Sequence, residues 1–542
     1  MAPIFVGPTD DDSKIRATRV GFAISTANPG TASVGDIYFN STDKQLRGYN
    51  GSEWVAIGGG GGGTAEFTVS GSLSDGQTVI VQSDGTVAGA ASTTLSDSVG
   101  TPTVYNSGST SDTDVAYSSQ DDKFVIAYKD DGSSSYGTVI VATINPDDNS
   151  VTFGTEVVFE YGNTNKCRAV YVPDTNKIVV AYYDYSNNSY GTAVAMSING
   201  TSVSLGSPQV FHSGASFDTA IAYDSTSQRV VVAYRDQSNS QQGTARLLRI
   251  NSDNSIDVYD GAVFNNGQTR NISLAHDTTN NKLVVAYKDA DNNNRGIANV
   301  GTVDTSNNTI SWGSESIFQY SETYDTSTVF DPSTGKILIT YTSGGEGDKG
   351  KAVVGTVSGT DITFGTAVVF NQNTSYGSKT VYVPRSGQVL VSYRDAASGY
   401  SQVLKTATIS GTTVSFGSSV SLSTSGNNAQ QAGLAYDTTN NRAFLSYKDQ
   451  DDSSKGKAVV YTPPLPGGTA TAANFLGFSD AAYTNGQTAT IQMIGSVDDA
   501  QTGLTTGSKF FVQNDGSIGT AASTPSIVAG TAISATKIIV RK

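Results

Sequence analysis

Eight aromatic residues lie in stretches rich in Asn, Ser, Asp and Gly, a composition typical of loops. An aromatic ring in such a loop can stack on the face of a sugar, and neighbouring Asn, Asp and Gln side chains can bond the sugar hydroxyls. Alternatively, each ring only covers a neighbouring loop, and the eight indicate a binding surface only as a group. The candidate ligand-binding residues are Tyr136, Tyr161, Tyr185, Tyr190, Phe217, Tyr324, Tyr376 and Tyr400.

Six aspartates each end a recurring phrase, Tyr-Lys-Asp or a close variant of it. Together they could form a ring of carboxylates for a sugar or for calcium. A role repeated this regularly is usually structural, so we favour an interpretation in which each Asp caps its own loop or pairs with the adjacent repeat. Only Ser343 departs from the pattern, beside the unusual loop 344–350. The six are Asp130, Asp184, Asp236, Asp289, Asp395 and Asp449.

Groups suited to catalysis are scarce in this chain. There are two histidines, His212 and His276. The single cysteine, Cys167, excludes an intrachain disulfide, and we interpret it as a small residue near a strand start. Hydrolysis of a polysaccharide would need two carboxylates roughly 5–10 Å apart. Asp325 and Glu346 are candidates, but no pattern marks them. We therefore predict that the chain is not an enzyme and has no catalytic residue, metal site or cofactor.

The phrase that carries these aspartates recurs seven times, which predicts a repeat architecture. Successive tyrosines of the phrase are 54, 52, 53, 54, 52 and 54 residues apart. In the third repeat, apolar runs at 220–223, 230–234, 243–250 and 256–264 alternate with polar turns, and none has helical spacing. Four strands in a repeat of this length fit a blade of a β-propeller. The repeated tyrosines are Tyr128, Tyr182, Tyr234, Tyr287, Tyr341, Tyr393 and Tyr447.

Two small positions accompany each tyrosine. The preceding residue is always Ala, Ser or Thr, which indicates that a larger group would crowd an adjacent blade. A glycine follows nine residues after six of the seven tyrosines, and only Gln402 departs. Such a glycine indicates either a positive φ or a close approach of the backbone.

The seventh repeat lacks a fourth strand of its own, because Pro463 and Pro464 follow its third. Segment 98–105 resembles the missing strand, so we expect it to complete the last repeat and to remove the open edges of a linear array. The predicted fold class is all-β: a seven-bladed β-propeller of four-stranded blades, closed by an N-terminal strand and flanked by small β modules. The linkers then share one face. We place any binding surface on the opposite face, which carries the loops between second and third strands.

The chain of 542 residues has a formal net charge of −15, which argues against nucleic acid and anionic membranes as partners. Its start has no basic region followed by a long apolar core, so we expect no signal peptide. No apolar stretch approaches the length of a membrane-spanning helix, so we expect no membrane insertion.

Shorter pieces flank the propeller, which we predict over residues 98–462. We expect an N-terminal β segment over 1–57, a glycine linker over 58–63, a short β module over 64–97 and a C-terminal β module over 463–542. The first piece is too small for a core of its own. The last two resemble each other in sequence and could pack together, with the propeller as an insertion between them.

The flanking segments carry a family resemblance. Residues 35–40 (Gly-Asp-Ile-Tyr-Phe-Asn) and 49–54 (Tyr-Asn-Gly-Ser-Glu-Trp) resemble segments near the N-termini of tailed-phage fibre and appendage proteins. Residues 503–516 and 529–540 look like a C-terminal module of virion proteins, notably from phages of marine cyanobacteria, and the repeats are similar to propeller repeats in such proteins. The resemblance implies a structural component of the phage particle, usually an oligomeric tail fibre or adhesin, and it carries over no catalytic residue.

Three functions remain open at this point. The first is a virion adhesin that contacts other virion proteins through its N-terminal segment and binds a host cell-surface glycan or protein through the free propeller face. The second is a polysaccharide depolymerase on the same scaffold. The third is a structural spacer or decoration protein without a ligand. The resemblance implies a location in the virion, after synthesis in the host cytoplasm, and by analogy with fibres a homotrimer.

Overall fold

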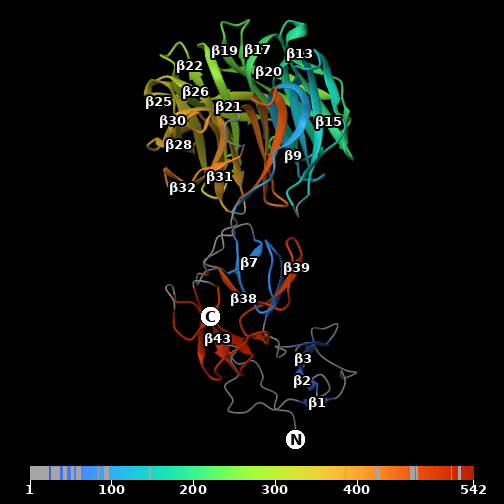
Figure 1. Cartoon of the computed structure of the whole chain (residues 1–542), viewed down its shortest axis with the longest axis vertical. Coiled ribbons are helices and arrows are strands. Elements are labelled where there is room, and N and C mark those ends of the chain that lie inside the picture. Colours follow the sequence, from blue (N-terminus) through green and yellow to red (C-terminus); the bar gives the residue numbers. More distant parts are fainter. Residues whose placement is uncertain are drawn as a thin grey trace. The chain divides into compact units, whose positions relative to one another are not determined.

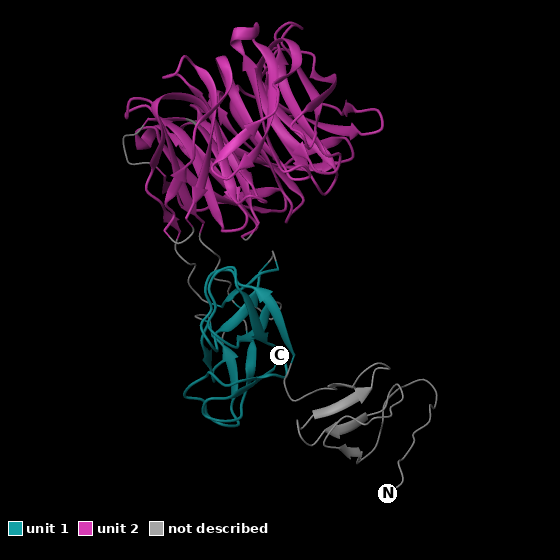
Figure 2. Ribbon diagram, turned by 90° about the vertical axis from the view of Figure 1, so that its right-hand side faces the viewer, with its two compact units in different colours: residues 1–93, 467–542 teal, residues 94–466 magenta. Residues whose placement is uncertain are grey.

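The computed structural model describes residues 63–541 apart from 83–84, 91–96, 146–147, 385, 423–427, 464–469, 471–473, 514–515 and 523–525, and four strands before them. The predicted linker at 58–62 lies outside the described residues. The described residues form strands and three short 3₁₀ turns, with no α-helix among them (Figure 1). The chain divides into two compact units, one of residues 94–466 and one of residues 1–93 with 467–542 (Figure 2).

Each repeat of the larger unit is an antiparallel meander around the strand that carries the repeated tyrosine. In the third repeat, β18 (Arg229–Asp236) pairs with β17 (Gln209–Asp224) and with β19 (Gln242–Ile250), which pairs in turn with β20 (Ile256–Asn265). The five central residues of β18 are all buried, as the continuously apolar sequence predicts. The predicted all-β fold is confirmed. The described strands form several separate sheets and no single closed sheet.

The same strand order recurs along the larger unit. Its second strands, which carry the tyrosines, are β10 (Lys123–Asp130), β14 (Lys177–Asp184), β18, β22 (Lys282–Asp289), β27 (Lys336–Ser343), β31 (Gln388–Asp395) and β36 (Arg442–Asp449). The first strands are β9 (Thr103–Ser118), β13 (Val157–Val172), β17, β21 (Thr269–Asp277), β26 (Thr323–Asp331), β30 (Val368–Val383) and β35 (Ala429–Asp437). The third strands are β11 (Tyr136–Ile144), β15 (Tyr190–Asn199), β19, β23 (Arg295–Asp304), β28 (Lys349–Ser358), β32 (Ser401–Ser410) and β37 (Lys455–Thr462). Further outer strands are β8 (Ser98–Val99), β12 (Val151–Phe153), β16 (Ser202–Leu205), β20, β24 (Thr309–Trp312), β25 (Ser316–Gln319), β29 (Asp361–Phe364), β33 (Thr413–Phe416) and β34 (Val420–Ser421).

The first and last repeats are in direct contact. Strand β8 and the start of β9 pair with β37, so the N-terminal segment adds its strands to the last repeat. The rings of Phe124 and Phe444 stack with their centroids 4.7 Å apart. Ser98 lies opposite Thr462, so the chain enters and leaves the larger unit at the same end of β37.

The repeated tyrosines form the core of the larger unit, and each is at most 1% exposed. In the third repeat, the ring of Phe211 lies 5.5 Å from that of Tyr234. The glycine nine residues after the tyrosine explains itself through such a ring: a Cβ on Gly243 would lie 2.3 Å from Cε2 of Phe264. The glycines of this column are absent from the residues with positive φ, so close packing rather than φ requires them.

The smaller unit joins segments from before and after the repeats. Strand β6 (Thr78–Val81) pairs with β38 (Phe475–Ser479), and β5 (Thr64–Thr68) pairs with β39 (Thr488–Gln492). Its other strands are β7 (Val87–Gly89), β40 (Val497–Asp498), β41 (Lys509–Val512), β42 (Ile518–Gly519), β43 (Val528–Ala532) and β44 (Ile538–Val540). The N-terminal segment contains one sheet, of β1 (Ala23–Ser25), β2 (Ile37–Asn40), β3 (Gln45–Tyr49) and β4 (Trp54–Ala56). Within the described residues, no helix has the length and apolarity to cross a membrane.

Candidate functional site

One cavity, with a volume of about 520 Å³, is lined by the first strands of all the repeats. Each first strand reaches the cavity at a β-bulge, where its pairing with the tyrosine strand skips a residue. In the first repeat the bulge lies next to the pair Ser111–Lys129, near the end of β10 that leads into the loop between second and third strands. The cavity therefore lies on the face where the sequence analysis placed a binding surface.

The bulge residues differ from repeat to repeat, although the tyrosine 16 residues later does not. Six of them have φ between 48° and 57°, a left-handed conformation that is strained for residues other than glycine. Their side chains include acids, an amide and a base, so the wall of the cavity is chemically asymmetric. These six are Asp112, Lys166, Asp218, Asn271, Asp325 and Gly377.

The four carboxylates that line the cavity all have partners. Asp112 Oδ1 lies 3.4 Å from Lys166 Nζ. Asp114 accepts a hydrogen bond from a backbone N–H at 3.1 Å, and Asp325 accepts one at 2.9 Å. Asp218 Oδ2 lies 3.2 Å from Nε of Arg235.

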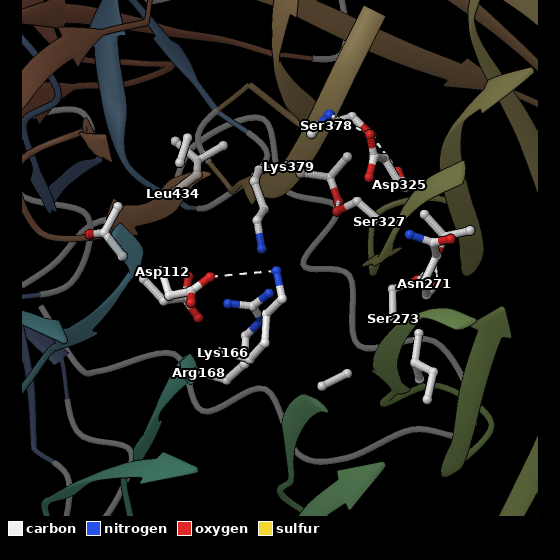
Figure 3. A pocket seen from close by; sticks show the side chains of 18 of the residues that line it. Asp112, Lys166, Arg168, Asn271, Ser273, Asp325, Ser327, Ser378, Lys379 and Leu434 are labelled. Carbon is white, nitrogen blue, oxygen red and sulfur yellow. Dashed lines mark hydrogen bonds and ion pairs between the residues drawn. The ribbon is translucent and has the colours of Figure 1, made fainter. Parts of the chain in front are cut away.

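Three basic side chains converge in the same cavity, Lys166 and Arg168 from β13 and Lys379 from β30 (Figure 3). Their nitrogen-bearing ends point toward one another in the open space. Arg168 donates a hydrogen bond of 2.8 Å to the carbonyl oxygen of Cys167. Burial and then the nearby Arg168 charge lower the pKa of the Lys379 ammonium to about 8.

A cluster of aromatic and basic side chains lies at the rim of the cavity. The Arg394 guanidinium is 4.8 Å from the ring centroid of Tyr376 and 5.2 Å from that of Tyr400. The two rings are 6.4 Å apart and nearly parallel, and they line a second cavity of about 200 Å³ with Arg394, Asn428 and Gln430. Such rings and amides are suited to sugar faces and hydroxyls. We call Tyr376, Arg394, Tyr400 and Asn428 the rim cluster.

Two of the eight aromatic candidates thus meet at the rim, and the other six are absent from the described residues that line the central cavity. Tyr136 and Tyr161 pack edge to face at 5.5 Å. Phe217 lies under the Arg235 guanidinium at 5.0 Å, and Tyr324 lies 4.2 Å from the Nζ of a lysine. The remaining two are Tyr185, in the turn η1 (Tyr185–Asn187), and Tyr190, at the start of β15.

The repeated aspartates cap their own loops, which confirms the structural interpretation. Asp236 accepts hydrogen bonds from the backbone N–H groups of Ser238 and Asn239 at 3.0 and 3.1 Å. Asp395 does the same for Ala397 at 3.1 Å and also accepts from an asparagine side chain of the preceding repeat. All six are at least nine-tenths buried. Among the described residues, no three His, Cys, Asp or Glu side chains gather closely enough to hold a metal ion.

The other residues considered for chemistry have structural partners. His212 Nε2 lies 3.1 Å from Asp236 Oδ1, and His276 Nε2 lies 3.0 Å from a carboxylate oxygen of the preceding repeat. Cys167 is fully buried, and burial raises the pKa of its thiol to about 12. Asp325 lines the cavity, whereas Glu346 lies 2.6 Å from a lysine Nζ, and this hydrogen bond lowers the pKa of its carboxyl.

Sequence reasoning missed the basic residues of the cavity. Lys166 lies 16 residues before its tyrosine, and Arg168 and Lys379 lie 14 before theirs. Aligning the repeats on the tyrosine would have placed them in two columns of changing residue type within an otherwise regular pattern. The bulge itself has no comparable signal, because non-glycine residues occupy most of its left-handed positions.

No protein-family model matches this chain. No curated protein matches it either. Among solved structures, the chain is similar to a protein of unknown function from Dyadobacter fermentans, with a TM-score of 0.41, 12% identity, and coverage of 68% of this chain and 98% of the other. It is also similar to the periplasmic gluconolactonase of Pseudomonas aeruginosa (TM-score 0.42, 12% identity, 64% and 94% covered). A Lactobacillus plantarum protein gives a TM-score of 0.37, 14% identity, and 59% and 91% coverage.

These neighbours have β-propeller-like folds, and at this identity the likeness concerns the fold alone. One expectation is corrected by them. We predicted that the chain is not an enzyme, and the similarity to the gluconolactonase overturns that prediction, because a protein with this type of fold is an enzyme. No lactone substrate or catalytic residue is transferred to this chain.

Proposed function

We propose that this chain is a structural protein of a phage particle, a tail fibre or adhesin, whose larger unit binds a host cell-surface glycan. The observation that carries the proposal is the rim cluster, which presents two aromatic rings, a guanidinium and an amide at the mouth of a polar cavity. The family resemblance of the flanking segments supplies the virion context. The N-terminal segment would then contact other virion proteins.

We further propose that the seven repeats close into a ring around the central cavity. The pairing of β8 and β9 with β37 supports this, since it brings together strands more than 300 positions apart in the chain. The inner wall supports it too, because strands from every repeat contribute to one cavity. Such a ring presents a single asymmetric site on its axis.

The size and chemistry of the cavity suit a short stretch of carbohydrate. Ligand sites for small molecules typically occupy roughly 300–1,000 Å³, and about 520 Å³ falls in this range. Serine and asparagine side chains line it beside the charged groups, which provides donors and acceptors for hydroxyls. The rings at the rim add flat apolar surface.

The proposal is tested by binding of the purified full-length protein to envelope polysaccharide from cyanobacterial strains, measured by calorimetry and by pull-down of whole cells. We expect saturable binding to some strains and none to others. Equal retention by all strains, unchanged when the rim cluster is altered, would favour a spacer or decoration protein. Imaging of the virion with a labelled antibody tests the location on the particle.

A second candidate function is depolymerisation of the bound polysaccharide. The observation that favours it is the presence of four aspartates in the wall of the cavity, because glycoside hydrolysis uses paired carboxylates. Release of new reducing ends from the polysaccharide would establish it. Loss of that release in Asp325→Asn, with binding retained, would assign the carboxylate.

A further inference from the structure

The basic side chains in the central cavity are unusual for so acidic a chain. The protein has 33 Lys and Arg against 48 Asp and Glu, yet Lys166, Arg168 and Lys379 direct their charges into one enclosed space (Figure 3). Like charges held together away from bulk water repel one another more strongly than on an open surface. Such an arrangement is stabilised when an anion lies between the charges.

The carboxylates of the cavity leave one of these charges without a partner. Asp112 pairs with Lys166, Asp114 and Asp325 accept backbone hydrogen bonds, and Asp218 faces Arg235. Lys379 makes no hydrogen bond or ion pair with any residue in the described part of the chain, although its ammonium points into the cavity. Its three N–H donors are therefore available to a ligand.

The surroundings of this charge resemble a sugar site rather than a site for a free ion. Ser273, Ser327 and Asn271 lie along the neighbouring wall of the same cavity. A simple inorganic ion would leave these polar groups and most of the volume to water. A sugar that carries an acidic substituent would use both, since its hydroxyls reach the serines and the amide while its anionic group reaches the bases.

We propose that the central cavity binds an acidic sugar, with its carboxylate or sulfate group held by Lys166, Arg168 and Lys379. This inference rests on the glycan-binding function proposed above and specifies the class of glycan. Lys166 and Arg168 enter from β13 and Lys379 from β30, so the anionic group bridges two strands far apart in the sequence. The site is distinct from the rim cluster, which would hold a neighbouring sugar ring.

The test uses calorimetry on the full-length protein with three oligosaccharides of equal length: a uronic acid oligomer, a sulfated oligomer and a neutral oligomer. Lys379→Gln removes the charge but keeps a hydrogen-bonding side chain, and Lys379→Arg keeps the charge. Lys123→Gln is the matched control, because Lys123 begins β10 and lies outside the cavity lining. We expect at least about ten-fold weaker binding of an acidic oligomer to Lys379→Gln, recovery in Lys379→Arg and no change in the control.

The pH dependence gives a second measurement. The charged groups that face Lys379 are Asp114 on β9, Lys166 and Arg168 on β13, and Asp325 on β26. Because the pKa of Lys379 is lowered to about 8, the wild-type protein should lose affinity for the acidic oligomer as the pH rises through that value. Lys379→Arg, which stays charged, should keep it.

Each result decides between the proposals. Preference for either acidic oligomer, with loss in Lys379→Gln, supports the acidic-sugar site, and the carboxylated and sulfated arms tell which group is recognised. Equal binding of the neutral oligomer, unaffected by Lys379→Gln, overturns the acidic-sugar site and leaves glycan binding intact. Failure of all three oligomers, together with failure to bind host polysaccharide, overturns both.

Discussion

The backbone N–H of Leu422 donates a 2.9 Å hydrogen bond to the carbonyl oxygen of Gln402, and this pair replaces the glycine–aromatic pair found in other repeats. At the corresponding places, an aromatic ring lies against the glycine, as Phe264 does against Gly243. Leu422 is 2% exposed and packs in the same cluster as Tyr447. The shorter Leu side chain thus leaves room for the side chain of Gln402, whose Oε1 accepts a 3.0 Å hydrogen bond from Ser392.

This relationship predicts a coupled pair of substitutions. Leu422→Phe alone should lower the free energy of unfolding by about 1–3 kcal/mol, because the ring would overlap the Gln402 side chain. Gln402→Gly alone should also destabilise, since it removes the bond to Ser392. The double variant should cost less than the sum by about 1–3 kcal/mol, as measured by urea unfolding in a double-mutant cycle. Additive effects would contradict the proposed complementarity.

The buried tyrosines predict a loss of stability at high pH. Burial raises the pKa of Tyr234 to about 12, whereas an exposed tyrosine titrates near 10. Between these values the unfolded chain releases a proton that the folded chain keeps, so the free energy of unfolding falls as the pH rises above about 10. Tyr234 alone contributes a loss of about 2–3 kcal/mol by about pH 12.

Urea unfolding at several pH values, with tyrosinate absorbance followed in parallel, measures this loss. Tyr447→Phe is a suitable comparison, because burial raises the pKa of Tyr447 and its hydroxyl has no hydrogen-bond partner among the described residues. This variant should match the wild type near neutral pH and exceed it above about pH 10. Stability that stays level through about pH 11 would contradict the expected linkage.

The repeat explains why so much of the fold could be predicted from the sequence. The spacing of the tyrosines located each second strand, and the match of segment 98–105 to a fourth strand anticipated its pairing with β37. Loop chemistry also transferred well, since each repeated Asp caps the turn that follows it. These features arise from contacts within one repeat or between neighbours, and a regular sequence records them many times.

The candidate site was less predictable, because it depends on what differs between repeats. Tyr376 and Tyr400 were recognised by their residue type in polar loops. The convergence of Lys166, Arg168 and Lys379 required knowledge that a bulge turns one column of residues toward the axis. The glycine column shows the same limit: the sequence indicated a small residue without identifying the aromatic ring that requires it.

The rim cluster predicts which aromatic residues affect ligand binding. Tyr376→Ala and Tyr400→Ala should each weaken binding of host polysaccharide by roughly five-fold, since a stacked ring contributes about 1 kcal/mol. Tyr161→Ala is the control, because Tyr161 is 74% exposed yet contacts Tyr136 rather than the rim. Calorimetry with the same polysaccharide preparation measures all three. A loss in Tyr161→Ala equal to the others would move the binding surface away from the cavity.

The pairing of the N-terminal strands with the last repeat predicts how the larger unit responds to trimming. A protein of residues 94–466 keeps β8, β9 and their bonds to β37, so its unfolding midpoint should equal that of the matching transition in the full chain. A protein that begins at residue 107 loses β8 and the ring of Tyr105, which lies 5.2 Å from that of Tyr128. Removal of one such buried ring costs about 3–5 kcal/mol, and the unpaired edge of β37 adds to the loss. Circular dichroism and urea unfolding measure both proteins, and equal stability of the two would show that contact between the first and last repeats contributes nothing to the fold.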